Sequence, residues 1–250
     1  MIDNKSLEVY INSLLNSTLI NDYAPNGLQV EGEKTINTIV SGVSASLELI
    51  EEAIKKNADA ILVHHGYFWK GEPSVITGIK YQRVKMLIQN NLNLFGYHLP
   101  LDIHPELGNN VQLAKLLNLN ILGEFNTDTT PSYGLMCQQT LRLDTLIEKL
   151  STTLKRQPLV VGLQKPDINK IAICTGGAQD FIEHAYRAGA DVYISGEISE
   201  RTTLFARELG ITYISAGHHA TERYGIQALG QHLAQKFNLA HYFIDIDNPV

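Results

Sequence analysis

INTIVSGVSASLELIEEAIKKNADAILVHH, residues 36–65, aligns without gaps on INKIAICTGGAQDFIEHAYRAGADVYISGE, residues 168–197. The offset between the two segments is constant at 132 residues, and about eight of the thirty positions are identical. Each segment reads as a β-rich run, a turn, an amphipathic helix and a second β-rich run. Such alternation is typical of α/β proteins. The two segments therefore predict an α/β fold built from two related halves.

A second, weaker sequence repeat supports the prediction of two related halves. His98-x-x-x-Asp102 resembles His218-x-x-x-Glu222, and each follows a predicted strand, at 94–97 and 212–215. Residues 124–132 have the least periodic pattern and are the best candidate linker. We therefore expect a first domain at 1–125 and a second at 126–250, with terminal segments able to cross over. Two related halves that face each other predict a ligand cleft between them.

Composition narrows the class of protein. The 250 residues are 44% hydrophobic, which is enough for a substantial core, and no apolar run reaches the length of about 20 residues that a membrane span needs. The formal charge of −6 and the lack of Lys/Arg runs argue against nucleic acid as a partner. The N-terminus shows no export signal, and Cys137 and Cys174 form no CxxC pair. These features predict a soluble cytoplasmic protein.

Histidines follow several of the predicted strands. His64 and His65 end the second β-rich run of the first copy, where the second copy has Gly196-Glu197. Neighbouring side chains on a strand point to opposite faces, so we expect the strand to end or twist here, as Gly66 permits. Sites in parallel sheets form at the carboxyl ends of strands. An isolated His pair is as often an ordinary polar strand end. Only the presence of the other candidate ligands favours a metal site here.

His218 and Glu222 are four residues apart, so they share one face if a helix opens at or before Thr221. Alone, such a pair is more often a hydrogen bond on a helix surface. Imidazoles with carboxylates suit Zn, Mn or Fe, and five such groups exceed the needs of one tetrahedral ion. Two ions about 3.5–4 Å apart activate a bridging water, which indicates hydrolysis. The candidate ligands are His64, His65, Asp102, His218 and Glu222.

Six motifs closely resemble those of the NIF-three-like family, also called the GTP cyclohydrolase 1 type 2 family, and in particular its short, YbgI-like bacterial branch. They are DYAPNGLQVEG (22–32), ADAILVHHGYFWKGE (58–72), GYHLPLDIHPELGNN (96–110), ICTGGAQ (173–179), ISGEISE (194–200) and AGHHATERYGI (216–226). The resemblance implies a NIF-three-like fold and a toroidal homohexamer. It also implies that the same five candidate ligands hold a dinuclear metal centre.

The sequence and the resemblance together predict a dinuclear metal-dependent hydrolase that acts on a small, nucleotide-like substrate through a metal-bridged water. The two divalent cations are Fe, Mn, Zn or Mg, and their identity stays open. A metal-dependent phosphatase or phosphodiesterase would use the same centre. A non-catalytic, ring-shaped binding or regulatory protein is a further alternative, and the sequence does not decide between these functions.

Other residues near the predicted site have two interpretations each. His98, His219 and Glu197 are the candidates for a general acid or base. Glu197 or Glu106 is also a candidate partner for the second ring nitrogen of a metal-binding His. His104 is either a substrate contact or a plain loop residue. Ordinary surface positions are expected for the histidines elsewhere, His184, His232 and His241.

Two further motifs carry weaker signals. Gly176-Gly177 is either an anion-binding turn or, as we favour, a tight turn without a ligand. The aromatic run 67–69 with Lys70 is suited to stacking on a base and holding a phosphate, but core or subunit packing explains Phe68 and Trp69 equally well. Asn26-Gly27 reads as a turn to which the sequence assigns no role.

Overall fold

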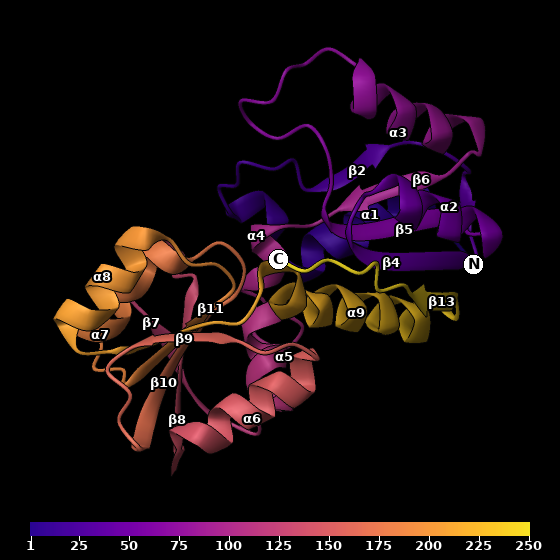
Figure 1. Ribbon diagram of the computed structural model, residues 1–250. Helices are drawn as coiled ribbons and strands as arrows, with labels where there is room; N and C mark the ends of the chain where they lie inside the picture. Colours follow the sequence, from indigo (N-terminus) through magenta and orange to yellow (C-terminus); the bar gives the residue numbers. More distant parts are fainter. The chain divides into compact units, whose positions relative to one another are not determined.

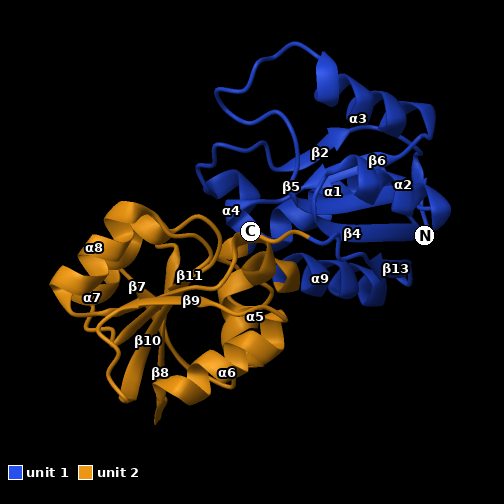
Figure 2. Cartoon of the chain, viewed as in Figure 1, with its two compact units in different colours: residues 1–101, 225–247 blue, residues 102–224, 248–250 orange.

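The computed structural model describes residues 1–250, which fold into two compact units (Figure 2). Unit 1 comprises residues 1–101 and 225–247, and unit 2 comprises residues 102–224 and 248–250. Both units combine a sheet with helices, as the alternating pattern predicts (Figure 1); the larger sheet of unit 1 is mainly parallel, and the sheet of unit 2 is mixed. None of the helices combines the length and the apolar character that crossing a bilayer requires.

Unit 1 contains a five-stranded sheet in the order β13-β4-β5-β6-β2 and a small β1-β3 sheet. Strands β13, β4, β5 and β6 run parallel, and β2 is antiparallel to β6. The elements are β1 (Ile2–Asp3), α1 (Asn4–Leu14), η1 (Ser17–Leu19), β2 (Gly27–Val30), β3 (Thr35–Ile36), β4 (Thr38–Ser44), α2 (Leu47–Lys55), β5 (Ala60–His65), α3 (Gly78–Gln89), β6 (Asn93–Gly96) and β13 (Ala240–Phe243).

Unit 2 contains a six-stranded sheet in the order β7-β8-β10-β11-β12-β9, in which β10, β11 and β12 are parallel. Its elements are α5 (Asn109–Leu116), β7 (Asn120–Phe125), β8 (Gly134–Arg142), α6 (Leu143–Leu154), β9 (Leu159–Gly162), β10 (Asp167–Cys174), η2 (Gln179–Phe181), α7 (Ile182–Arg187), β11 (Val192–Ser195), α8 (Glu200–Leu209) and β12 (Thr212–Ser215). Helices α4 (Leu99–Asp102) and α9 (His218–Phe237) contribute residues to both units.

Helix α2 illustrates how local sequence sets an element. The Ser46 side chain accepts a hydrogen bond from the Leu49 N–H at 3.1 Å and so caps the helix. Glu48 in the first turn and Lys55 in the last turn complement the helix dipole. The apolar positions of the helix face the core of unit 1 and bury Leu49, Ile50 and Ala53. The helical period of the sequence therefore becomes the packing face of the helix.

The strand registers of the two units match at the offset of 132 residues. Ile39 pairs with Ala60 between β4 and β5, and Ile171 pairs with Val192 between β10 and β11. Each copy also places an aspartate carboxylate on two consecutive N–H groups in the first half of its first strand or directly before it. Asp59 accepts from residues 37 and 38, and Asp191 accepts from residues 169 and 170. This agreement is consistent with two related halves.

The strand registers show that the second sequence repeat, at His98 and His218, is offset by one residue from the structural correspondence of the two units. Asn93 of β6 pairs with Ala60, and Thr212 of β12 pairs with Val192, so β6 and β12 correspond at an offset of 119 residues. The structural equivalent of His98 is therefore Gly217 and not His218. The sequence alignment that matches His98 with His218 is therefore wrong by one residue. The structural correspondence is set by the register of the strands that precede these residues and not by the identity of their side chains.

The observed units also differ from the expected domains at 1–125 and 126–250, although the expectation allowed terminal segments to cross over, as residues 225–247 do. The chain passes from unit 1 to unit 2 between residues 101 and 102 and returns between 224 and 225. Strand β7 pairs antiparallel with β8, so the expected linker at 124–132 connects two neighbouring strands within unit 2. Asp102, expected in the first half, belongs to unit 2. Strand pairing places these segments, and local composition carries little information about it.

Candidate functional site

In unit 1, three histidines meet at the carboxyl ends of β5 and β6. Val63 of β5 pairs with Gly96 of β6, so the residues that follow emerge at one edge of the sheet. His64, His65 and His98 each place a ring nitrogen within 4.8 Å of the others. The ring centroids of His64 and His98 are 5.0 Å apart, and both side chains are buried. This group is able to hold a metal ion.

Each of the three imidazoles has one nitrogen engaged by the protein. Nδ1 of His64 lies 2.9 Å from the carbonyl oxygen of Tyr97, and Nδ1 of His65 lies 3.1 Å from the Ser44 hydroxyl. Nδ1 of His98 lies 3.0 Å from a carboxylate oxygen of Asp22. Metal-binding histidines show this arrangement, in which the partner of one nitrogen fixes the ring so that the other nitrogen faces the cation.

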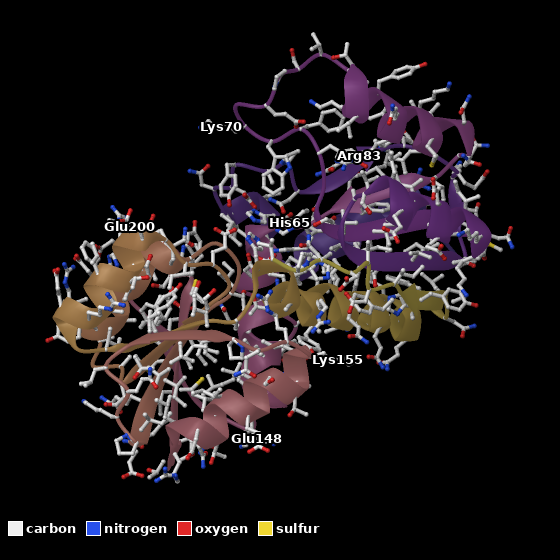
Figure 3. The ribbon with its side chains drawn as sticks, viewed as in Figure 1. His65, Lys70, Arg83, Glu148, Lys155 and Glu200 are labelled. Atoms are coloured by element: carbon white, nitrogen blue, oxygen red, sulfur yellow. The ribbon has the colours of Figure 1, made fainter.

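Strand β5 remains paired with β4 up to His65, so the two adjacent histidines belong to a regular strand end. We expected Gly66 to allow the strand to end or twist, and the structure gives it a second task. A Cβ atom at Gly66 would lie 2.1 Å from Oε1 of Gln29. Glycine is therefore needed for close approach of the Gln29 side chain. Figure 3 labels His65 at this strand end and Lys70 on the loop that follows.

In unit 2, the carboxyl ends of three parallel strands also lie at one sheet edge, since Cys174, Ser195 and Ser215 are in register. Helix α9 begins at His218, directly after this edge, and Glu222 follows one turn later on the same face of the helix, as the spacing predicts. Nε2 of His218 lies 3.1 Å from Oε2 of Glu222. The Glu222 side chain is buried.

Glu197 holds the other side of the His218 ring, with Oε1 at 2.7 Å from Nδ1. Burial alone would lower the pKa of His218, but the hydrogen bonds and charges of Glu222 and Glu197 outweigh it and raise the pKa to about 9. Asp102 is oriented by Asn109, whose amide donates to it at 2.7 Å. Unit 2 thus presents an imidazole and two carboxylates that are oriented by neighbouring side chains.

The Gly176-Gly177 turn packs against these carboxylates. The Gly176 N–H donates to the Thr221 hydroxyl at 3.1 Å, which leaves this amide engaged inside the protein and supports the tight-turn interpretation. Gly176 has a φ of +70°, and a Cβ atom there would lie 2.1 Å from Oε1 of Glu222. The turn therefore needs glycine for its backbone conformation and for the space that Glu222 occupies.

The remaining histidines of the sequence have defined surroundings. Nδ1 of His104 accepts the N–H groups of residues 106 and 107, which supports its interpretation as a loop residue. The His219 N–H donates to the carbonyl of Val250, and the side chain is buried. The others bond to nearby polar groups: His184 to Asp128, His232 to Tyr10 and His241 to Ser41.

The aromatic residues that follow the histidine pair, residues 67–69, have different surroundings. The Tyr67 hydroxyl donates to the Ala45 carbonyl inside the core, and Phe68 packs against the same core. Trp69 instead lies beside the histidines, with its ring centroid 5.0 Å from that of His98 and 5.5 Å from that of Tyr23. Of these three aromatic residues, only Trp69 is therefore placed to contact a molecule bound beside the histidines.

Sequence reasoning missed Asp22, which belongs to a motif without an assigned role. Burial alone would raise the pKa of this carboxyl group. The hydrogen bond and charge of His98, with the Asn26 amide and the Ala24 N–H, outweigh burial and lower the pKa to about 2. The Asp22 side chain is only 2% exposed, and its lowered pKa makes it an ionised carboxylate within the protein at neutral pH.

The lowered pKa of Asp22 predicts a loss of stability in acid. The ordinary pKa of 3.8 falls to about 2 on folding, so the ionised form stabilises the folded state above pH 4. This contribution, about 2 kcal/mol, disappears as the pH falls through the window from 4 to 2. Urea unfolding at a series of pH values should show the stability gap between wild type and Asp22→Asn narrowing across that window. A gap that is independent of pH would contradict the assignment.

Comparisons with known proteins identify the family of the chain. The family model for Duf34/NIF3 (NGG1p interacting factor 3) matches residues 2–249. A relative from Pasteurella multocida, named GTP cyclohydrolase 1 type 2 homolog, is 54% identical over 97% of this chain and 98% of its own length. A relative of the same name from Escherichia coli K12 is 51% identical over 98% of this chain and 99% of its own length.

Solved structures of two similar proteins match the fold of the chain. The structure of protein ybgI, described as of unknown function, covers 100% of both chains with a TM-score of 0.95 and 48% sequence identity. A protein from Thermus thermophilus also covers 100% of both chains, with a TM-score of 0.90 and 29% identity. The matches extend along nearly the whole sequence. The chain therefore belongs to the Duf34/NIF3 family.

Proposed function

We propose that the protein is a dinuclear metal-dependent hydrolase of the GTP cyclohydrolase 1 type 2 kind. Family membership and the names of the relatives support this proposal, but the observation that carries it is the histidine group of unit 1, in which His64 and His65 are proposed ligands and His98 lies beside them. Side chains at or just after the carboxyl ends of neighbouring strands hold ring nitrogens within 4.8 Å, and each ring is fixed through Nδ1. Purely structural histidines need no such common orientation.

We propose that the metal ligands are the five residues His64, His65, Asp102, His218 and Glu222. Their chemistry fits a pair of divalent cations, because three imidazoles and two carboxylates suit Zn, Mn or Fe. In unit 2 the Glu197–His218 hydrogen bond has the form expected of a metal-binding histidine and its carboxylate partner. Paired cations, when bound, supply Lewis-acid activation of water and of the substrate.

The protein's own residues would then orient the substrate and move protons. His98, His219 and Glu197 are the proposed general acid or base. A nucleotide-like substrate is supported by the names of the relatives and by Tyr23 and Trp69, whose rings form an aromatic wall beside His98. A purine base has the flat apolar face that such a wall stacks against. We also propose a toroidal homohexamer located in the cytoplasm.

One experiment tests the proposed reaction. Purified protein loaded separately with Mn²⁺, Fe²⁺ and Zn²⁺ is incubated with GTP and other nucleotides, and formate and inorganic phosphate are measured in the same samples. Formate release that depends on two bound ions per chain is the expected result. Phosphate release alone would instead support the phosphatase or phosphodiesterase alternative. Two bound ions without any turnover would support the non-catalytic ring, and no bound metal would contradict the proposal.

A further inference from the structure

The segment Asp22–Gln29, DYAPNGLQ, surrounds the histidines of unit 1. The carboxylate of Asp22 receives four hydrogen bonds. Oδ1 lies 3.0 Å from Nδ1 of His98 and 3.0 Å from the Ala24 nitrogen, and Oδ2 lies 2.9 Å from the Leu99 nitrogen and 3.0 Å from Nδ2 of Asn26. The His98 side chain is only 7% exposed, so these contacts occur away from water.

Two more side chains of this segment bind the backbone next to the histidines. Oδ1 of Asn26 accepts the N–H of His98 at 2.8 Å. Oε1 of Gln29 accepts the N–H of Tyr67 at 2.7 Å. Gln29 also fills the space that a Cβ atom would need at Gly66 or at Gly96, with closest approaches of 2.1 and 2.6 Å. The segment therefore contacts both strand ends that carry the histidines.

The hydrogen bonds of Asp22 determine where His98 carries its proton. Backbone N–H groups and the amide Nδ2 of Asn26 only donate, and an ionised carboxylate only accepts. Nδ1 of His98 must therefore donate to Oδ1 of Asp22. In a neutral imidazole the second nitrogen, Nε2, then carries the lone pair. Since His64 and His65 also have Nδ1 engaged, the same nitrogen of each ring is directed to the common space.

We propose that Asp22 is a positioning residue that fixes the Nδ1–H tautomer and the orientation of His98, so that Nε2 accepts a hydrogen bond from water or a substrate group held beside His64 and His65. The inference deepens the proposed function and rests on it for the substrate. The orientation and the tautomer of His98 are properties of the chain alone. They can therefore be tested whether or not the protein proves to be a hydrolase.

Asp22→Asn changes the tautomer in a way that the contacts predict. The amide NH₂ of the new side chain must replace one carboxylate oxygen. At the Oδ2 position it would face two obligate donors, Leu99 N–H and Asn26 Nδ2. At the Oδ1 position it faces one obligate donor, Ala24 N–H, and Nδ1 of His98, which is able to switch to an acceptor. The second arrangement is preferred, and it moves the His98 proton to Nε2.

The test is magic-angle-spinning ¹⁵N NMR of sedimented full-length protein labelled only at histidine, at about pH 8, above the ordinary pKa of about 6.5 of a free imidazole. His98→Gln identifies the His98 signals by their loss. Asp59→Asn is the matched control, because Asp59 also accepts two backbone N–H bonds in unit 1, at 2.8 and 2.9 Å, and its carboxylate bonds to no histidine. Metal content and formate release from GTP are measured on the same preparations.

The expected result is Nδ1–H at His98 in wild type and Asp59→Asn, and Nε2–H in Asp22→Asn. Formate release should fall roughly 10²- to 10⁴-fold in Asp22→Asn, which is the range that general acid–base catalysis contributes, with a wrong histidine tautomer at its upper end. An Nε2–H signal in wild type would overturn the inference without any variant, and so would an unchanged tautomer in Asp22→Asn. If wild type binds no metal and releases no formate, the proposed function fails while the tautomer still decides the role of Asp22.

Discussion

Replacing Glu222 with glutamine should lower the apparent affinity for Mn²⁺ by at least about 100-fold and abolish metal-dependent hydrolysis at the same time. Glu222 is buried, and its Oε2 lies 3.1 Å from Nε2 of His218, so the carboxylate and the imidazole present their ligand atoms together. Glutamine keeps the size of the side chain but removes the negative charge that attracts a divalent cation. Calorimetric titration with Mn²⁺ and metal analysis of the purified variant measure the loss.

A control for this variant is Glu183→Gln. Glu183 forms an exposed i,i+4 ion pair with Arg187 at 2.9 Å, so the substitution repeats the chemical change at a helical pair that has no proposed ligand role. The control should bind Mn²⁺ as wild type does. If Glu222→Gln also keeps two ions at wild-type affinity, Glu222 is not a ligand and the proposed centre is wrong. If metal is lost but turnover persists, the hydrolysis does not depend on this centre.

The sequence predicts the α/β class well because the class depends on local patterns. The segment 36–65 and its copy at 168–197 each contain strand, turn and helix within thirty residues, and the strand registers agree with the sequence offset. The opening of α9 at His218 is local in the same sense, since it requires only the spacing to Glu222 and the preceding turn. Periodicity and spacing are sufficient where the determining contacts are close along the chain.

The boundaries of the units along the chain and the role of Asp22 depend on contacts between residues that are far apart in the sequence. Asp22 is 76 residues from His98 along the chain, and Gln29 is 38 residues from Tyr67. No period or spacing links such pairs, so a single sequence identifies the DYAPNGLQ motif without revealing what it binds. Strand β7 likewise belongs to unit 2 because it pairs with β8, and the unpatterned residues between them resemble a linker. Long-range polar pairing and sheet order are what sequence reasoning lacks here.

Replacing Gly176 with alanine should destabilise the protein and also displace the Glu222 carboxylate. The backbone has a φ of +70°, which costs a residue with a Cβ atom about 1 kcal/mol. The new Cβ atom would also lie 2.1 Å from Oε1 of Glu222 and 3.4 Å from Nε2 of His218. Because Glu222 is buried, its side chain has little room to move, and overpacking adds roughly 1–3 kcal/mol.

Gly189→Ala separates these two effects. Gly189 also belongs to unit 2 and has a φ of +81°, but an added Cβ atom would meet only Nζ of Lys170, at 3.8 Å. This variant should lose only the backbone contribution and bind Mn²⁺ normally, whereas Gly176→Ala should lose both stability and Mn²⁺ affinity. Urea unfolding and Mn²⁺ titration of the two variants side by side make the comparison. Equal effects in both would mean that the Gly176 turn does not set the position of Glu222, and the geometry assigned to the carboxylate would have to be abandoned.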